Sequence, residues 1–296
     1  MPTVYLGTSD FAAAVLERLA RSRHRPSLVV TRPDRQRGRG RRLASPPAAD
    51  TARALDIDVI QPESVNDDDA RRRIADERPE AVCVCAFGGL LKEPLLSEHE
   101  VLNVHPSLLP RWRGAAPVER AIMAGDDKTG VSMMRLTEGL DAGPVCLQSA
   151  VPIHPDDTYG SLASRLQDVS GELLIEALSG PRRFAEQDEG RATYAEKIGP
   201  EDRVLDPGRF AQELEWVVRA LTPHIGARAE LPGGMVVGVC DAAALAHGPP
   251  QGEVAVQDER LLLGCASGAL ELRVVKPPGG RPMPAADFLR GHALAG

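Results

Sequence analysis

Short apolar stretches alternate with helix-like stretches through the first hundred residues, and this alternation most constrains the fold. Apolar runs of strand length lie at residues 3–6, 27–31, 81–86 and 102–105, with helical spacing of apolar side chains between them. Strands that alternate with helices form a parallel sheet, because each crossover helix returns the chain to the same edge. The sequence therefore predicts an α/β domain with a doubly wound, mostly parallel sheet. Ligands of such sheets bind beyond the carboxyl ends of the strands.

The pattern changes near residue 180. Residues 180–203 are rich in charge, glycine and proline and have no periodicity, which predicts a linker. A helix should follow, with Asp206 as N-cap, Pro207 at its first position, and Phe210 among the apolar residues on its buried face. From Ala227 onward, short strands broken by glycine and proline turns predict a smaller β-barrel. We expect three consecutive parts: a domain at 1–183, a linker at 184–205 and a C-terminal domain at 206–296.

Composition narrows the class of protein. A chain of 296 residues with 43% hydrophobic and 26% charged residues suits a two-domain globular protein. The N-terminus lacks the features of a signal peptide, and no apolar run approaches the length of a membrane span. The five cysteines have no metal-type spacing. We therefore expect a cytoplasmic protein, with no membrane contact, no bound metal and a monomeric state.

Three polar side chains of catalytic type lie between Leu102 and Pro144. Asn103 and His105 are two residues apart at the end of an apolar run, so they share one face of an extended strand. Asp141 lies between two glycines, where the backbone can turn sharply. An amide can donate to a developing oxyanion, an imidazole can exchange a proton near neutral pH, and a carboxylate can orient the imidazole. Together they suit acyl or formyl transfer to an amine without a covalent nucleophile.

A structural role is the alternative for each of these residues. A histidine at a strand end is commonly a capping or surface residue, and an aspartate between glycines is commonly a turn residue. The neighbouring sequence, HPSLLPRWRGAAP followed by GLDAG, favours the catalytic interpretation. Two prolines flank its short apolar loop and stiffen the backbone beside the polar pair.

A basic segment interrupts a chain whose net charge is −7. Nine arginines and a single acid, Asp34, lie between Arg21 and Arg42. A general preference for arginine over lysine explains the residue type but not the clustering. A basic loop on an acidic protein is typical of a local phosphate-binding site, and a solvated basic turn is the alternative. Its glycines and the Pro46–Pro47 pair predict an irregular loop.

The run NVHPSLLPRWRGAAP together with GLDAGP closely resembles the methionyl-tRNA formyltransferases, within the folate-dependent formyltransferase family. The resemblance continues through GTSDFAA, the AFG of residues 86–88 and the TYAEKI of residues 193–198, and so covers most of the chain. It implies a Rossmann-like formyltransferase domain and an OB-like C-terminal barrel that helps to bind tRNA. It also implies that Asn103, His105 and Asp141 are the catalytic residues.

The resemblance further implies an activity and its two substrates. The formyl group of 10-formyltetrahydrofolate would pass to the α-amine of methionyl-initiator tRNA, for use in translation initiation, and no metal would take part. Three loops are the expected folate contacts: Ser107, Leu108, Leu109 and Pro110; Phe87, Gly88, Leu90 and Leu91; and Glu138 with Gly139. In the basic segment, the expected tRNA contacts are Arg39, Arg41, Arg42 and Leu43.

Other activities fit parts of the same pattern. A sugar-amine formyltransferase or a formyltetrahydrofolate hydrolase could have the same three residues and two domains, and a glycinamide ribonucleotide formyltransferase would lack the second domain. The basic segment and TYAEKI favour the tRNA enzyme. A non-catalytic RNA-binding protein on this scaffold is disfavoured, because all three catalytic residue types are present. The pattern does not decide whether His105 or Asp141 accepts the proton, how elongator tRNA is rejected, or how far the C-terminal domain contributes to tRNA binding.

Overall fold

A computed structural model describes residues 2–37 and 42–292 and divides the chain into two compact units. The first unit is formed by Met1–Gly114, Thr129–Val151 and Ala163–Tyr194. The second is formed by Ala115–Lys128, Pro152–Leu162 and Ala195–Gly296. The units interleave along the sequence, and the three consecutive parts at 1–183, 184–205 and 206–296 remain a prediction.

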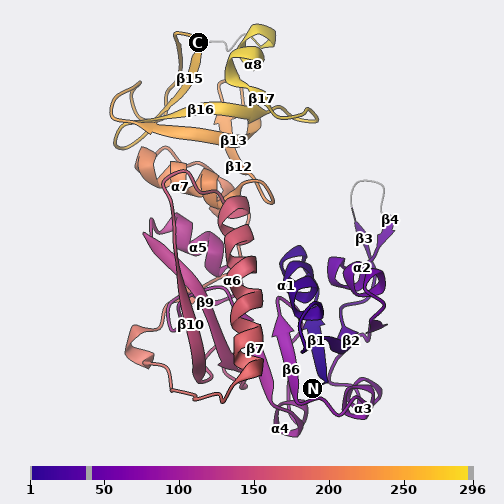
Figure 1. The fold of residues 1–296 in the computed structure, drawn as a ribbon. Coiled ribbons are helices and arrows are strands. Elements are labelled where there is room, and N and C mark those ends of the chain that lie inside the picture. The colour runs from indigo at the N-terminus through magenta and orange to yellow at the C-terminus, as the bar shows by residue number, and fades with distance from the viewer. Residues whose placement is uncertain (1, 38–41, 293–296) are drawn as a thin grey trace. The chain divides into compact units, whose positions relative to one another are not determined.

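A seven-stranded sheet lies at the centre of the first unit (Figure 1), in the order β10-β9-β7-β6-β1-β2-β5. The neighbouring strands from β5 to β7 are parallel, whereas β9 is antiparallel to β7. The doubly wound, mostly parallel sheet is therefore confirmed. The strands are β1 (Thr3–Gly7), β2 (Pro26–Val30), β5 (Asp58–Ile60), β6 (Ala81–Cys85), β7 (Val101–His105), β9 (Lys128–Arg135) and β10 (Val145–Pro152).

The inner strands are apolar throughout because both faces of the sheet are covered. Every residue of β1, β6 and β7 is buried. Helix α1 begins after Ser9, whose hydroxyl accepts a hydrogen bond from Ala12 N at 3.3 Å. Because β7, β6 and β1 are adjacent and parallel, the residues after Gly7, Cys85 and His105 reach the same edge of the sheet. The helices named from here on are α1 (Asp10–Ala20), α2 (Pro47–Ala54), α3 (Asp68–Asp76), α4 (Leu95–Glu98) and α6 (Tyr159–Ser179).

The basic segment contains a hairpin in place of the irregular loop that the sequence predicts. Strands β3 (Arg35–Arg37) and β4 (Arg42–Ala44) pair antiparallel after β2. The cross-strand register pairs Gln36 with Leu43, and Leu43 is 69% exposed. Residues 38–41, and with them Arg39 and Arg41, lie outside the described residues. The prediction of an irregular loop was therefore wrong for residues 35–37 and 42–44, because these two short strands pair with each other.

A curled antiparallel sheet forms the core of the second unit, in the order β12-β13-β16-β15-β14, with β17 paired to β16. A cluster of buried, mostly aliphatic side chains that includes Phe288 forms the hydrophobic core of this unit. The smaller C-terminal β-domain is confirmed, in the form of a half-barrel. Its elements are α7 (Ala211–Leu221), β12 (Ala227–Leu231), β13 (Met235–Leu245), β14 (Val254–Gln257), β15 (Arg260–Gly264), β16 (Ala269–Lys276), β17 (Met283–Pro284) and α8 (Ala285–Gly291), with α5 (Pro117–Met123) and the short turn η2 (Glu201–Arg203) in the same unit.

Helix α7 begins at Ala211, four residues after the predicted start at Pro207. Asp206 instead closes a turn, in which Gly208 N donates to its Oδ1 at 2.8 Å and Arg209 N donates to its carbonyl at 3.0 Å. Phe210 is the N-cap and is 56% exposed, so the prediction that Phe210 belongs to the apolar face of this helix was wrong. The side chain of Asp206 bonds to the backbone of the turn, which competes with a helical start.

Two findings bear on the expected class of protein. In the described part of the chain, no helix combines the length and apolar character needed to cross a membrane. Cys83 and Cys85 are buried in β6, and this burial raises the pKa of both thiols to about 12. Both side chains therefore stay protonated near neutral pH.

Candidate active site

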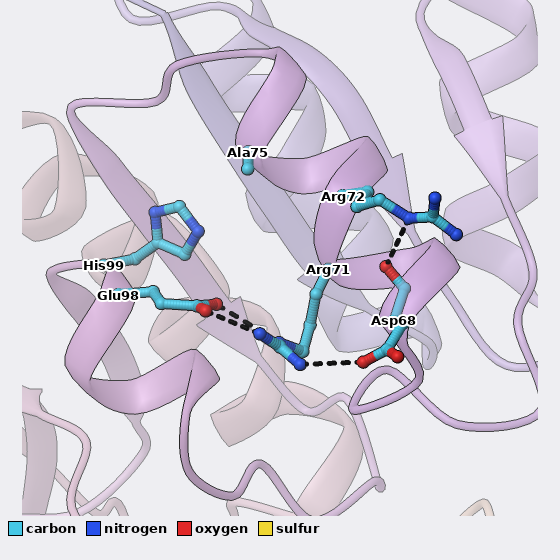
Figure 2. A pocket seen from close by; sticks show the side chains of 6 residues that line it. All are labelled: Asp68, Arg71, Arg72, Ala75, Glu98 and His99. Atoms are coloured by element: carbon cyan, nitrogen blue, oxygen red, sulfur yellow. Dashed lines mark hydrogen bonds and ion pairs between the residues drawn. The ribbon is translucent and has the colours of Figure 1, made fainter.

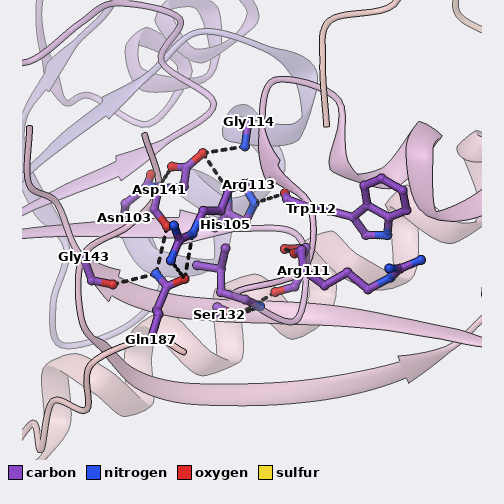
Figure 3. Close-up of polar contacts among 12 residues, drawn as sticks. Asn103, His105, Arg111, Trp112, Arg113, Gly114, Ser132, Asp141, Gly143 and Gln187 are labelled. Atoms are coloured by element: carbon purple, nitrogen blue, oxygen red, sulfur yellow. Dashed lines mark hydrogen bonds and ion pairs between the residues drawn. The ribbon is translucent and has the colours of Figure 1, made fainter. Parts of the chain in front are cut away.

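The structure brings Asn103, His105 and Asp141 together (Figure 3). Asn103 and His105 lie at the carboxyl end of β7 and are 9% and 4% exposed. Asp141 lies in the turn between β9 and β10, where its backbone takes a left-handed φ of 46°. Asn103 Nδ2 lies 3.4 Å from Asp141 Oδ1, and His105 Nδ1 lies 3.6 Å from Asp141 Oδ2. The cluster sits at the sheet edge where ligands of such folds bind.

The backbone of Trp112 selects one tautomer of His105. His105 Nε2 lies 2.8 Å from the Trp112 carbonyl oxygen. A carbonyl only accepts hydrogen bonds, so Nε2 must carry a hydrogen and donate it. Nδ1 is then the nitrogen that can gain or lose a proton, and it faces Asp141 across 3.6 Å. That distance exceeds a direct hydrogen bond, which leaves the proton site open to a reacting group or a water.

The chain next to Trp112 also contacts the carboxylate. Gly114 N donates to Asp141 Oδ2 at 2.9 Å, so one short segment fixes both ionisable groups of the site. Thr193 supports this segment: its Oγ1 accepts from Trp112 N at 2.9 Å, and its carbonyl accepts from Arg113 N at 2.9 Å. The sequence predicted no role for these backbone groups, because hydrogen bonds of the main chain leave no signal in residue identity.

The loop 107–110 after β7 is closed by internal hydrogen bonds. The Ser107 hydroxyl is fully buried and donates to the Arg111 carbonyl at 2.6 Å. The Ser132 hydroxyl donates to the Ser107 carbonyl at 2.6 Å and accepts from Leu109 N at 3.1 Å. Ser107 and the buried Leu109 thus shape the loop from inside, and their contact with folate remains a prediction. The two residues of the loop that are partly exposed are Leu108 and Pro110.

Among the predicted folate contacts in the loop after β6, two residues are buried and one leucine is exposed. Phe87 is 5% exposed and its carbonyl accepts from Thr8 Oγ1 at 2.7 Å, and Leu91 is 4% exposed. Leu90 is 67% exposed, and its carbonyl accepts from Asn66 Nδ2 at 2.8 Å. The Leu90 side chain is therefore exposed to solvent, while the hydrogen bond from Asn66 to the Leu90 carbonyl holds the backbone in place.

The turn before Asp141 also contains an exposed leucine. Glu138 and Gly139 are exposed, and Leu140 between them and Asp141 is 62% exposed. Gly88, in the loop after β6, is also exposed and has a φ of 71°. Exposed leucines on the loop after β6 and on the turn before Asp141 suit a flat, largely apolar ligand.

A cavity of about 260 Å³ connects the loop after β6 to the base of the arginine hairpin. The Arg32 side chain lines this cavity, and its Nη1 lies 3.4 Å from the Gly88 carbonyl oxygen. The wall combines cationic and apolar groups, which suits a ligand with a phosphate and an apolar part. The lining residues are Thr8, Arg32, Pro33, Arg35, Ala44, Pro46, Phe87 and Gly88.

A larger cavity, of about 690 Å³, lies by α3 and α4 near the amino end of β7 (Figure 2). Its charges are largely neutralised, since Arg71 contacts Asp68 at 3.0 Å and Glu98 at 2.6 Å. It lies at the edge of the sheet opposite the carboxyl ends of the strands, so fold logic assigns it no catalytic role despite its volume. It is lined by Asp68, Arg71, Arg72, Ala75, Glu98 and His99. The described side chains include no group of three or more His, Cys, Asp or Glu residues able to hold a metal ion.

Comparison with known proteins decides the family. Residues 1–178 match the formyl transferase family, and residues 197–293 match the formyl transferase C-terminal domain. The methionyl-tRNA formyltransferase of Rubrobacter xylanophilus is 45% identical over 306 residues, covering 100% of this chain and 99% of that protein. That of Methylococcus capsulatus is 42% identical over 304 residues, covering 100% and 98%. This chain belongs to the methionyl-tRNA formyltransferase family.

Solved structures share the fold at lower identity. HypX from Aquifex aeolicus in complex with tetrahydrofolic acid has a TM-score of 0.63 and 18% identity, covering 97% of this chain and 46% of that one. The N-formyltransferase from Helicobacter canadensis, in complex with folinic acid and dTDP-3-aminofucose, has a TM-score of 0.67 and 15% identity. It covers 92% of this formyltransferase and 98% of its own chain. The predicted two-part fold is thus found in solved proteins.

Proposed function

We propose that this protein transfers the formyl group of 10-formyltetrahydrofolate to the α-amine of methionine esterified to initiator tRNA. The product would be formylmethionyl-tRNA for translation initiation. The observation that carries the proposal is the convergence of Asn103, His105 and Asp141 in a chain that matches named methionyl-tRNA formyltransferases over its full length.

Formyl transfer needs a group that donates a hydrogen bond to the developing oxyanion, and Asn103 is suited to that role. The amine attacks the formyl carbon, so a new C–N bond forms and the carbonyl oxygen becomes negative. The bond from that carbon to N10 of the folate then breaks, and N10 leaves with a proton. Asn103 Nδ2 lies 3.4 Å from Asp141 Oδ1, a long contact that is readily exchanged for an oxyanion.

The proton that the attacking amine loses has two possible acceptors, His105 Nδ1 and the Asp141 carboxylate. His105 Nε2 is occupied by the Trp112 carbonyl and cannot take part. The two acceptors face one another at 3.6 Å, so a proton taken up by one group lies within reach of the other. The substrate proton would enter this pair and be returned from it to N10.

Several loops of the first unit offer surfaces that would suit the two substrates. The exposed Leu90 and Leu140 offer apolar contacts for the folate rings. The cavity beside Arg32 suits the phosphate-bearing 3′ end of the tRNA, and the hairpin that follows β2 would contact the acceptor stem. We further propose that the protein works as a cytoplasmic monomer.

The direct test is tetrahydrofolate release from 10-formyltetrahydrofolate with charged initiator tRNA, with a dTDP-amino sugar and without an acceptor. Charged initiator tRNA should support rapid release and acquire the formyl group. Release at the same rate without any acceptor would identify a hydrolase. Release only with a dTDP-amino sugar would identify a sugar-amine formyltransferase, and binding of tRNA without release would favour the non-catalytic RNA-binding protein.

Neutralising Arg39, Arg41 and Arg42 together should raise KM for charged tRNA heavily while leaving folate affinity nearly unchanged. Each lost phosphate contact should lower the logarithmic salt slope of tRNA binding by about one. The measurement is tRNA affinity as a function of salt concentration. The folate site is built from other loops and should not respond.

A matched control removes three exposed arginines outside the basic segment: Arg72, Arg183 and Arg290. This control changes the net charge by the same amount, so it separates local contacts from the overall charge. An unchanged salt slope in the hairpin variant, or an equal change in the control, would mean that the hairpin is a solvated basic turn.

A further inference from the structure

The turn that presents Asp141 has a backbone conformation that needs support. Asp141 has a φ of 46°, in the left-handed region that side chains other than glycine rarely adopt. Two residues on, a Cβ added to Gly143 would lie 2.0 Å from the Arg135 carbonyl oxygen, so the chain passes tightly against β9. Groups outside the turn must therefore stabilise it.

Gln187 supplies that support from a distant part of the same unit (Figure 3). Its Nε2 donates to the Asp141 carbonyl at 2.8 Å and to the Gly143 carbonyl at 2.7 Å. Both hydrogens of the amide are thus used on the two sides of one turn. The side chain ties the turn to a segment 46 residues beyond Asp141.

Arg113 fixes which way the Gln187 amide points. Arg113 Nε and Nη2 donate to Gln187 Oε1 at 3.0 and 2.9 Å. Arginine has only donors, so the amide oxygen must face Arg113 and the amide nitrogen must face the Asp141 turn. Arg113 is 2% exposed, and Glu189 accepts from its Nη1 and Nη2 at 2.9 and 2.7 Å. This fork-to-carboxylate pairing compensates the buried charge and immobilises the guanidinium.

The same short segment contacts the ionisable groups themselves. The neighbours of Arg113 are Trp112, whose carbonyl accepts from His105, and Gly114, whose N–H donates to Asp141. The Asp141 backbone and the Asp141 carboxylate are thereby fixed by one continuous set of contacts.

We propose that Gln187, oriented by Arg113, is a positioning residue for formyl transfer. It maintains the Asp141 turn so that the carboxylate faces His105 and Asn103. The proposal rests on the proposed function for the identity of the reaction, but the role of Gln187 can be measured with whichever formyl acceptor the wild-type protein uses.

The test is a double-mutant cycle with Gln187→Glu and Asp141→Asn. Gln187→Glu keeps the shape and an acceptor for Arg113 but points an oxygen at two carbonyl oxygens. In the wild-type background it should lower kcat roughly tenfold, with little change in KM for folate. In the Asp141→Asn background the further loss should be less than about twofold, because the carboxylate that Gln187 positions is gone.

A purely structural role would give a different pattern. Equal losses in both backgrounds, or a lower unfolding temperature with unchanged kcat in the folded fraction, would overturn the proposal. If Gln187→Glu fails to fold, Gln187→Asn takes its place, because it keeps the amide but cannot span both carbonyls. Gln187→Asn should lower kcat by an intermediate amount, and wild-type kcat in Gln187→Asn would also overturn the proposal. Glu186→Gln, an exposed neighbour, is the control and should leave kcat unchanged. If wild-type protein formylates an acceptor other than tRNA, the proposed function fails while this cycle still decides the role of Gln187.

Discussion

Replacing Asn103 with alanine is expected to lower kcat for formyl transfer by roughly 10²–10³, or about 3–4 kcal/mol, with a smaller effect on KM. Asn103 is 9% exposed at the end of β7, and its Nδ2 has only a 3.4 Å contact with Asp141 in this structure. The oxyanion forms during the reaction, so a donor aimed at it stabilises the transition state more than the bound substrates. In a site shielded from water, this preferential stabilisation of the transition state is large.

Single-turnover formylation of charged initiator tRNA measures this effect without interference from product release. Asn103→Asp is the sterically matched variant, because it keeps the side-chain shape but removes the donor. Both variants should be severely slowed. Near-normal turnover in Asn103→Ala removes the residue from the mechanism, and near-normal turnover in Asn103→Asp shows that its shape matters and its donor does not.

The second large effect is expected when His105 or Asp141 is replaced. Asp141→Asn and His105→Ala should each lower kcat by roughly 10²–10⁴, the range of general acid–base catalysis. The double variant should be little worse than the slower single variant. His105 Nδ1 and Asp141 Oδ2 face one another at 3.6 Å and the remaining ring nitrogen is occupied, so the two groups handle one proton together. Losing either one removes the function of both.

The kinetics of the two single variants and the double variant, measured at saturating substrates, decide this point. Asp188→Asn is a suitable control, since it changes an exposed carboxylate of the same unit that accepts a hydrogen bond from the local Gly190 N–H at 3.0 Å. Losses that multiply would show two independent roles. A single variant with near-normal kcat would exclude that residue from proton transfer.

Local sequence patterns determined much of the fold. The alternation of apolar strands with helices predicted the parallel sheet. The spacing of Asn103 and His105 placed both on one face of β7, because side-chain direction in a strand depends only on the position along the chain. These predictions succeed because strand and helix periods are properties of consecutive residues.

Only the tertiary structure decided how distant segments meet. Strand β9 runs antiparallel to β7 and ends with Arg135 opposite Leu102. Asp141 reaches the site because the turn after β9 folds back, so that its carboxylate lies 3.4 Å from Asn103 Nδ2. Gln187 lies in a stretch that the sequence predicted to be a linker, yet it stabilises the catalytic turn. Helix α7 starts later than its cap signal because the side chain of Asp206 bonds within a local turn. Such contacts depend on packing between segments, and the free energy of packing is not a function of any one segment's residues.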